Sequence, residues 1–255
     1  MALCSAQHDR RQAFAALKSE LSAAPPRQLP EAIIPTSIPA LDAILGGGFP
    51  RGTLVTLEGN AGRWSIAARL TAHVTRHALT AIVDGGELYP PSLAHAGVRL
   101  DRVLIAPART PLGVARAVDI LLRTRACRLV MVPSAPELRA NVWLRLARLA
   151  QRAGVLLLVI AARAGGALAA ATGMRVDCIL DRVHVHGTRG LWCAFAGYDF
   201  SVRVLKHHAL SVAGTVAARV RALDVPDGAT LRHCTLAVSQ AEVPPRREQR
   251  YAAVR

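Results

Sequence analysis

The chain has 255 residues, of which 52% are hydrophobic and 4% aromatic, enough for one large domain with an aliphatic core. Its longest apolar run, residues 155–162, is far shorter than the roughly 20 residues of a membrane helix, and residues 1–14 turn charged before a signal-peptide core forms. The five scattered cysteines contain no C-x-x-C pair and indicate neither a disulfide framework nor a zinc site. We therefore expect a soluble, cytoplasmic protein.

The charge of the chain is strongly positive. Lys and Arg number 32 against 17 Asp and Glu, a formal net charge of +15. A GC-biased coding sequence explains why only Lys18 and Lys206 are lysines, but it does not explain the excess of cations. The excess favours a polyanionic partner such as nucleic acid, contacted directly or within a complex. Folded basic proteins without such a partner also exist, so this alternative stays open.

Near the amino terminus, Phe14, Leu17 and Leu21 lie at helical spacing on an otherwise polar segment, which predicts a short amphipathic helix. The proline-rich stretch that follows, residues 22–35, predicts an extended linker. This arm either covers the core or docks on a partner, and the sequence leaves both readings open. We assign residues 1–32 to the arm.

Apolar runs of strand length alternate with amphipathic helical patterns after a first helix expected from residue 38. The alternation predicts an α/β fold, a twisted and mostly parallel sheet with helices on both faces. The strands are expected at residues 54–59, 79–84, 102–106, 128–133 and 155–162, and the helices at residues 65–78, 113–127 and 138–154.

The pattern changes beyond Gly173, where residues alternate like antiparallel strands around a GTRG turn and are expected to extend the sheet along one edge. His184 and His186 share one face of such a strand, but no third ligand accompanies them, so no metal site is predicted.

Beyond residue 225 the composition predicts weak structure ending in a basic tail that contains Arg246 and Arg247. The tail is either solvated or becomes ordered on a partner. We assign residues 33–208 to the core and residues 209–255 to a carboxy-terminal extension.

The stretch TLVTLEGNAGRWSIAARLTAHV reads as strand, glycine loop and helix, the layout of a phosphate-binding loop. That loop, G-x-x-x-x-G-K-[ST], surrounds phosphates with backbone N–H groups and supplies a Lys and a metal-binding hydroxyl. Here two residues instead of four separate Gly59 from Gly62, Arg63 stands in place of the Lys, and Trp64 stands in place of the hydroxyl residue. Ser65 comes one position late, so the frame of the motif is kept without its chemistry.

The segment IPTSIPALDAILGGGFPRGTLVTLEG resembles the stretch that leads into the phosphate loop of RecA-type ATPases. The resemblance continues through AIVDGGELYPPSLAHAGVRLDRVLIA and, more weakly, FSVRVLKHH, and so covers roughly residues 33–208. It implies a RecA-like core behind an amino-terminal helix. Ser37 departs from the pattern, because the family usually has Gly there. The matching positions are Thr36, Leu41, Asp42, Leu45, Gly46, Gly47, Gly48, Pro50 and Gly52.

Further departures fall at positions where the resemblance implies ATPase chemistry. Asp84 is kept in the second strand, but Gly86 occupies the position of the water-activating Glu, and Glu87 follows it. Pro133 occupies the position of the Walker B Asp, which helps to hold Mg²⁺. With the altered loop, these changes predict a pseudo-ATPase with no catalytic residues, no cofactor and no small-molecule substrate. Gly59, Gly62, Arg63, Ser65 and Asp84 are its expected nucleotide-loop remnant.

Within the RecA-like proteins, LYPPSLAHAGVRLDRVL and the RGLW turn resemble the ImuA family of bacterial damage-inducible mutagenesis cassettes. This resemblance implies an accessory role in SOS mutagenesis, in which error-prone translesion synthesis is supported through contacts with ImuB, a polymerase homologue, and with RecA. The arm with Phe14, Leu17 and Leu21 is a candidate docking element for these partners.

Two alternatives to this accessory role stay open. The first is an active RecA-type ATPase with a divergent loop that uses Arg63 and Ser65. The second is a SulA-like cell-division inhibitor, a class that is also RecA-like without a phosphate loop but typically shorter and less basic.

The connections that correspond to the DNA-gripping loops of RecA, residues 134–143 and 161–174, are short. DNA affinity is therefore expected to be diffuse and salt-dependent, from arginines on helix faces and in the tail. Alternatively, these arginines only face solvent on the polar side of an amphipathic helix and bind no partner. The candidate DNA or partner contacts are Arg139, Arg145, Arg148, Arg152, Arg163, Arg175, Arg246 and Arg247.

Overall fold

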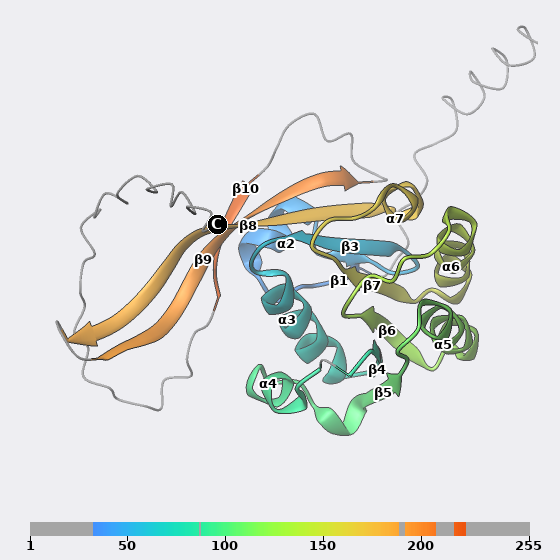
Figure 1. The fold of residues 1–255 in the computed structure, drawn as a ribbon, viewed down its shortest axis with the longest axis horizontal. Helices are drawn as coiled ribbons and strands as arrows, with labels where there is room; N and C mark the ends of the chain where they lie inside the picture. Colours follow the sequence, from blue (N-terminus) through green and yellow to red (C-terminus); the bar gives the residue numbers. More distant parts are fainter. Residues whose placement is uncertain (1–32, 87, 189–191, 208–216, 223–255) are drawn as a thin grey trace, which may run out of the picture.

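The computed structural model describes residues 33–86, 88–188, 192–207 and 217–222. They contain an eight-stranded sheet with the strand order β10-β9-β8-β3-β7-β6-β4-β5 (Figure 1). The strands from β8 to β5 in this order run parallel, whereas β9 and β10 are antiparallel to their neighbours. The strands are β3 (Leu54–Gly59), β4 (Leu79–Asp84), β5 (Val103–Pro107), β6 (Cys127–Val132), β7 (Leu156–Ile160), β8 (Met174–Thr188), β9 (Trp192–His207) and β10 (Ala217–Ala222).

Helices cover both faces of this sheet (Figure 1). One face carries α2 (Pro39–Leu45) and α3 (Arg63–Thr75), and the other carries α5 (Pro111–Thr124), α6 (Ala140–Ala153) and α7 (Gly166–Ala171). The remaining elements are α4 (Pro90–His95), the 3-10 turn η1 (Leu100–Arg102) and a two-stranded sheet of β1 (Ile33–Ile34) and β2 (Phe49–Pro50).

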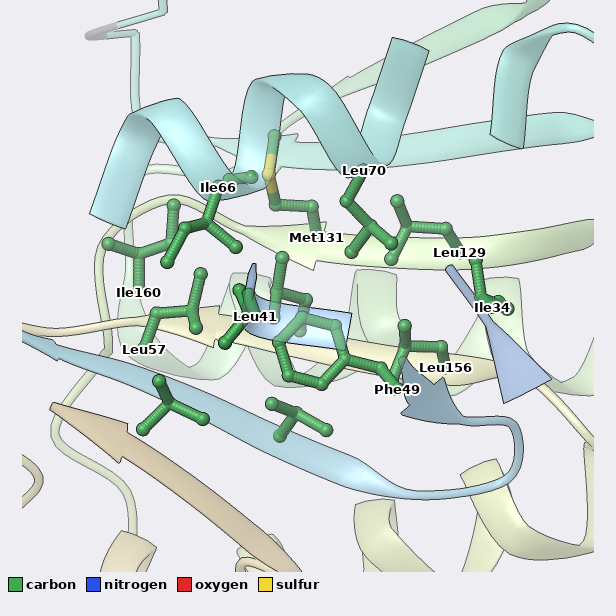
Figure 2. Packing of buried hydrophobic residues seen from close by; sticks show 14 of the residues in the cluster. Ile34, Leu41, Phe49, Leu57, Ile66, Leu70, Leu129, Met131, Leu156 and Ile160 are labelled. Atoms are coloured by element: carbon green, nitrogen blue, oxygen red, sulfur yellow. The ribbon is translucent and has the colours of Figure 1, made fainter. Parts of the chain in front are cut away.

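The central strands are buried on both faces, which is why their sequences are continuously apolar. In β6, Leu129 and Met131 pack toward α3, whereas Val130 and Val132 pack toward α5 and α6. Figure 2 shows the first of these two cores, with Ile66 of α3 above the sheet. Successive side chains of a strand alternate between the two cores, so each strand contributes to both.

The entry into β3 depends on backbone conformations that favour glycine. Gly46 ends α2 in the left-handed region, and a Cβ on Gly48 would lie 2.2 Å from the carbonyl oxygen of Ile34. Ser37 also has a positive φ of 61°, a backbone conformation that favours glycine, the residue that the RecA resemblance implies at this position. Asp42 holds the turn before α2 by accepting hydrogen bonds from the amide and hydroxyl of Thr36, at 2.8 and 2.7 Å.

The α/β class, the parallel sheet covered on both faces and the antiparallel edge are confirmed. The sheet continues past residue 208, because β10 pairs with β9. Sequence patterns did not indicate the short helices α4 and α7. The predicted arm, with Phe14, Leu17 and Leu21, and the predicted tail, with Arg246 and Arg247, lie outside the described residues.

Candidate functional site

A small cavity of about 340 Å³ lies at the carboxyl ends of β3, β6 and β7. In parallel α/β sheets this edge is where ligands bind. Arg63 and Trp64 reach the cavity from α3, Pro133 and Ser134 follow β6, and Arg163 follows β7. Among the described residues that line the cavity, the charged ones are Arg63 and Arg163, and none is an Asp or Glu.

The loop between β3 and α3 is tied by its backbone to the neighbouring strands. The amide of Gly59 donates to the carbonyl of Ala162 at 3.1 Å, and the amide of Asn60 donates to the carbonyl of Cys178 at 3.0 Å. The side-chain oxygen of Asn60 accepts from the amide of Leu180 at 2.9 Å. The amides of Gly59 and Asn60 therefore donate to protein carbonyls and are not directed at a ligand.

Side chains of β9 pack against the start of α3. Gly62, the N-cap of α3, has a φ of 77°, and a Cβ there would lie 2.3 Å from the ring of Phe200. Phe200 is buried and pairs with Tyr198 at a centroid distance of 5.9 Å. The Tyr198 hydroxyl lies 3.0 Å from the hydroxyl of Ser65. The hydroxyl that sequence reasoning offered as a late substitute for the metal ligand is thus hydrogen-bonded to β9.

Asp84 ends β4 and is buried, and its carboxylate stabilises the turn that follows. It accepts hydrogen bonds from the amides of Gly86 at 2.9 Å and Leu88 at 3.2 Å. Gly86 has a φ of 106°, with open space where a Cβ would be. Glu87 lies outside the described residues.

An ion pair that the sequence did not indicate joins the buried Glu58 of β3 to the partly buried Arg175 of β8. Arg175 donates through Nε and Nη2 to the carboxylate of Glu58, at 2.7 and 3.0 Å, and the amide of Ala164 donates to the same carboxylate at 2.9 Å. Burial alone would raise the pKa of Glu58, but these hydrogen bonds outweigh it and hold the pKa below its ordinary value. Arg175, a candidate DNA contact from the sequence, is therefore engaged within the fold.

The candidate arginines of α6 are exposed, as their helical spacing predicted. Arg139, the N-cap of α6, and Arg148 and Arg152 on its outer side contact solvent. Arg145 is paired, because its Nη2 lies 2.9 Å from the carboxylate of Asp119 on α5. Arg163 lines the small cavity and so lies apart from this helix face.

Between α3 and α4 lies a larger open groove of about 970 Å³, which sequence reasoning missed. Arg69, His73 and Arg76 line it from one side of α3, and Trp64 and Tyr89 stand at its surface. The i, i+4, i+7 spacing of the three basic residues on one helix is the signal that was available in the sequence. Burial, and then the charges of Arg76 and His77, lower the pKa of His73.

RecA proteins are among the curated proteins to which this chain is similar. RecA of Nostoc punctiforme is 33% identical over 102 residues, which make up 38% of this chain and 28% of that protein. RecA of Picosynechococcus sp. is 30% identical over 115 residues, 44% of this chain and 33% of that protein. The chain therefore spans about a third or less of the length of these curated relatives. No protein-family model matches the chain.

The crystal structure of the RadB recombinase has the same fold, with a TM-score of 0.59 at 17% identity over 76% of this chain and 97% of that chain. The chain is therefore similar to RecA in sequence over 38–44% of its length and shares its fold with the RadB recombinase. Within this RecA-like core, Arg63 lines the small cavity and Ser65 lines the large groove, and Trp64 stands between them and lines both. The two side chains of the proposed divergent phosphate loop thus face different spaces.

Two further findings concern the described part of the chain alone. It contains no group of three or more His, Cys, Asp or Glu side chains arranged to hold a metal ion. None of its helices combines the length and the apolarity needed to cross a membrane.

Proposed function

We propose that this RecA-like chain is a non-catalytic accessory protein of damage-induced, error-prone translesion DNA synthesis, of the ImuA kind. The observation that carries the proposal is that none of the described residues around the cavity at the carboxyl ends of β3, β6 and β7 is an Asp or Glu. Phosphoryl transfer on ATP requires Mg²⁺, held by oxygen ligands, and a residue that orients the attacking water. Among the described residues that line the cavity, Ser134 supplies a side-chain oxygen, its hydroxyl, that could contact a metal ion.

The loop geometry supports the same proposal. Asn60 and Gly59 donate their amides to protein carbonyls, and Phe200 fills the space beside Gly62. A phosphate-binding loop works by directing successive amides at the ligand, and here two of these amides are already used. A divergent ATPase that combines Arg63 with Ser65 is the weaker alternative, because these side chains line different cavities.

We infer that the chain acts through protein contacts. The resemblance to RecA implies that nucleotide joins successive protomers of a filament, so a homologue without nucleotide would not extend a filament of its own. It would still present one assembly surface, and RecA and an ImuB-like polymerase homologue are the partners that we propose. The amphipathic arm with Phe14, Leu17 and Leu21 is the proposed docking element.

Partner binding tests this role directly. We expect the full chain to bind immobilised RecA or the ImuB-like protein, and a triple Phe14→Ala, Leu17→Ala, Leu21→Ala variant to lose that binding. A matched variant of the opposite, polar side of the predicted helix, Asp9→Ala, Gln12→Ala, Ser19→Ala, should bind like the wild type. Unchanged binding of both partners after deletion of residues 1–24 together with the tail beyond Pro244 would contradict the docking role.

A further inference from the structure

The two ends of the eight-stranded sheet differ in how they are protected against pairing with another strand. β10 forms one end, and its sequence includes Arg219 and Arg221. Charged residues on an edge strand oppose such pairing. β5 forms the other end (Figure 1), has the uncharged sequence VLIAP, and pairs on its outer side with no strand of the described residues. β5 is therefore the end of the sheet to which a further strand can be added.

Both faces of β5 are apolar where the strand is exposed. Leu104 is 53% exposed and Ile105 is 38% exposed. Successive side chains of a strand alternate between the faces of the sheet. Val103 packs against the core beneath α3, and Ala106 packs against the core beneath α5, so Ile105 and Leu104 lie on these two faces in turn. A strand added beside β5 would cover apolar surface on both faces.

The backbone of β5 shows which groups it offers to such a strand. The amide of Ala108 donates to the carbonyl of Asp84 on β4 at 2.8 Å. Because backbone groups alternate in direction along a strand, those of Val103, Ile105 and Pro107 point away from β4. Proline has no N–H group. The outer side of β5 therefore offers the N–H groups of Val103 and Ile105 and the carbonyls of all three residues.

We propose that β5 pairs with the β5 of a second copy of this chain, antiparallel and centred on Ile105, so that the two sheets become continuous. Each Ile105 N–H then donates to the Ile105 carbonyl of the other copy, and each Val103 N–H donates to the Pro107 carbonyl. This arrangement uses every outward N–H group of the two edges. The dimer is closed, because both copies contribute the same edge and neither edge stays open.

The charges that flank β5 favour this register. Four residues before Ile105 lies Asp101, and four residues after it lies the exposed Arg109, so each faces the other across the two copies. The Asp101 side chain is 61% exposed and pairs with Arg99 at 3.0 Å, and a carboxylate can accept from a second cation as well. A register centred on Leu104 would instead place Arg99 against Arg109, where like charges repel.

Sedimentation velocity of the full chain at about 1–100 µM should show a monomer–dimer equilibrium, since short-strand interfaces are of the small, weak class. Leu104→Lys should weaken the dimer at least about 10-fold, because it adds a charge to the edge of each copy. The matched control Leu144→Lys adds the same charge at a leucine of α6 that is 41% exposed, and its dissociation constant should stay within about twofold of the wild type. Circular dichroism of both variants should match the wild type.

Salt separates direct pairing from association through bound nucleic acid. Both copies carry a formal net charge of +15, so added salt should strengthen a direct dimer by screening their repulsion. An assembly bridged by nucleic acid would weaken as salt rises, and that result would overturn the proposal.

Cysteine crosslinking tests the register. Ile105→Cys should form a disulfide between copies under mild oxidation, because hydrogen-bonded antiparallel neighbours have Cα atoms about 5.5 Å apart, a span that suits a disulfide. Leu104→Cys should crosslink far less, because Leu104 faces Ala106 of the other copy and the two Leu104 positions are diagonal, about 7–8 Å apart. The wild type, with its native cysteines, gives the background. Stronger crosslinking through Leu104→Cys would overturn the register.

Four other results would overturn the dimer. The full chain could stay monomeric at 100 µM, or its dimer could persist in Leu104→Lys. Deletion of residues 1–32 could turn a monomer into a dimer, which would mean that the arm covers β5. Leu104→Lys could abolish binding of RecA or the ImuB-like protein by a monomeric chain, which would assign the edge to that protein. The inference is independent of the accessory role: binding of RecA without a dimer removes the dimer alone, and a dimer without RecA or ImuB binding removes the role alone.

Discussion

Replacing Arg175 by Met tests how much of the fold depends on the buried ion pair between β3 and β8. The change removes two hydrogen bonds, of 2.7 and 3.0 Å, from a Glu58 carboxylate that is 4% exposed. The Ala164 amide would still donate its hydrogen bond to the carboxylate, and the charge of Arg163 would act on it from nearby. Breaking one side of a buried pair costs about 3–5 kcal/mol because the remaining charge stays buried without its partner.

This loss is a large share of the total, since domains unfold with about 5–15 kcal/mol. With a denaturant slope of about 2–3 kcal/mol/M, the urea midpoint should fall by about 1–2.5 M. The comparable surface change, Arg145→Met, breaks the pair with Asp119, in which the Arg145 side chain is 64% exposed, and should cost less than about 1 kcal/mol.

The effect should depend on pH in a defined direction. The pKa of Glu58 is lowered in the fold, so its contribution to wild-type stability is complete above the ordinary carboxyl pKa of 4.5 and is lost as pH falls through the lowered value. In the Arg175→Met variant, burial without the guanidinium raises the pKa of Glu58, so acid relieves the penalty. The deficit relative to wild type should therefore be largest at neutral pH and shrink below about pH 5.

Urea unfolding followed by circular dichroism at pH 7 and pH 4 measures both effects. The double variant Glu58→Gln, Arg175→Met should recover part of the loss, because Gln is neutral and still accepts from the Ala164 amide. A deficit below about 1 kcal/mol, or one that is equal at the two pH values, would refute the reasoning.

Three other predictions concern the start of α3 and the neighbouring strands β8 and β9. Gly62→Ala should destabilise the fold by about 2–4 kcal/mol, because its Cβ would meet the Phe200 ring and the backbone φ is positive. The control Gly86→Ala has open space for the Cβ and should cost only about 1 kcal/mol of backbone strain, so equal losses in urea unfolding would contradict the prediction. Ser65→Ala and Tyr198→Phe should each lower the free energy of unfolding by about 1 kcal/mol, because each removes the hydrogen bond between the two hydroxyls. The double variant should lose about 1 kcal/mol less than the sum of the two single losses, and additive losses would mean that the hydroxyls do not interact. Burial, and then the charge of Asp177, raise the pKa of the Cys178 thiol to about 12. Mass spectrometry should therefore find Cys178 unmodified after iodoacetamide treatment of the native protein at pH 8 and alkylated after unfolding, and rapid labelling of the native protein would contradict the burial.

Periodicity predicted most of the sheet because its strands are buried on both faces. Strands β3 and β4 have the predicted bounds, since apolar runs such as LVTLEG and LTAIVD end at Gly59 and Asp84. The strand, loop and helix around Gly62 were also predictable, because glycine marks the N-cap of α3. The helices α4 and α7, of six residues each, are too short for a helical period to appear in the sequence.

The site was harder to predict because its contacts join distant parts of the chain. Glu58 and Arg175 are 117 residues apart, and Ser65 and Tyr198 are 133 residues apart. Local patterns carry no signal for such pairs, which depend on β8 lying beside β3 and on β9 lying beside β8. Arg175 is an example. In the sequence it stands at the end of a segment expected to be a loop, which suggested a cation available to DNA, whereas in the structure it lies in β8 and is paired with Glu58.

Titration of the full chain with a fluorescent ATP analogue and Mg²⁺ tests the proposed loss of ATPase chemistry most directly. Turnover is assayed in the same sample, with and without single-stranded DNA, and RecA is the positive control. The cavity lined by Arg63, Pro133 and Arg163 has no carboxylate among its described residues, which predicts no Mg²⁺-dependent binding at high micromolar analogue and no turnover. Saturable binding with DNA-stimulated turnover would contradict the account and make this RecA-like chain an active ATPase.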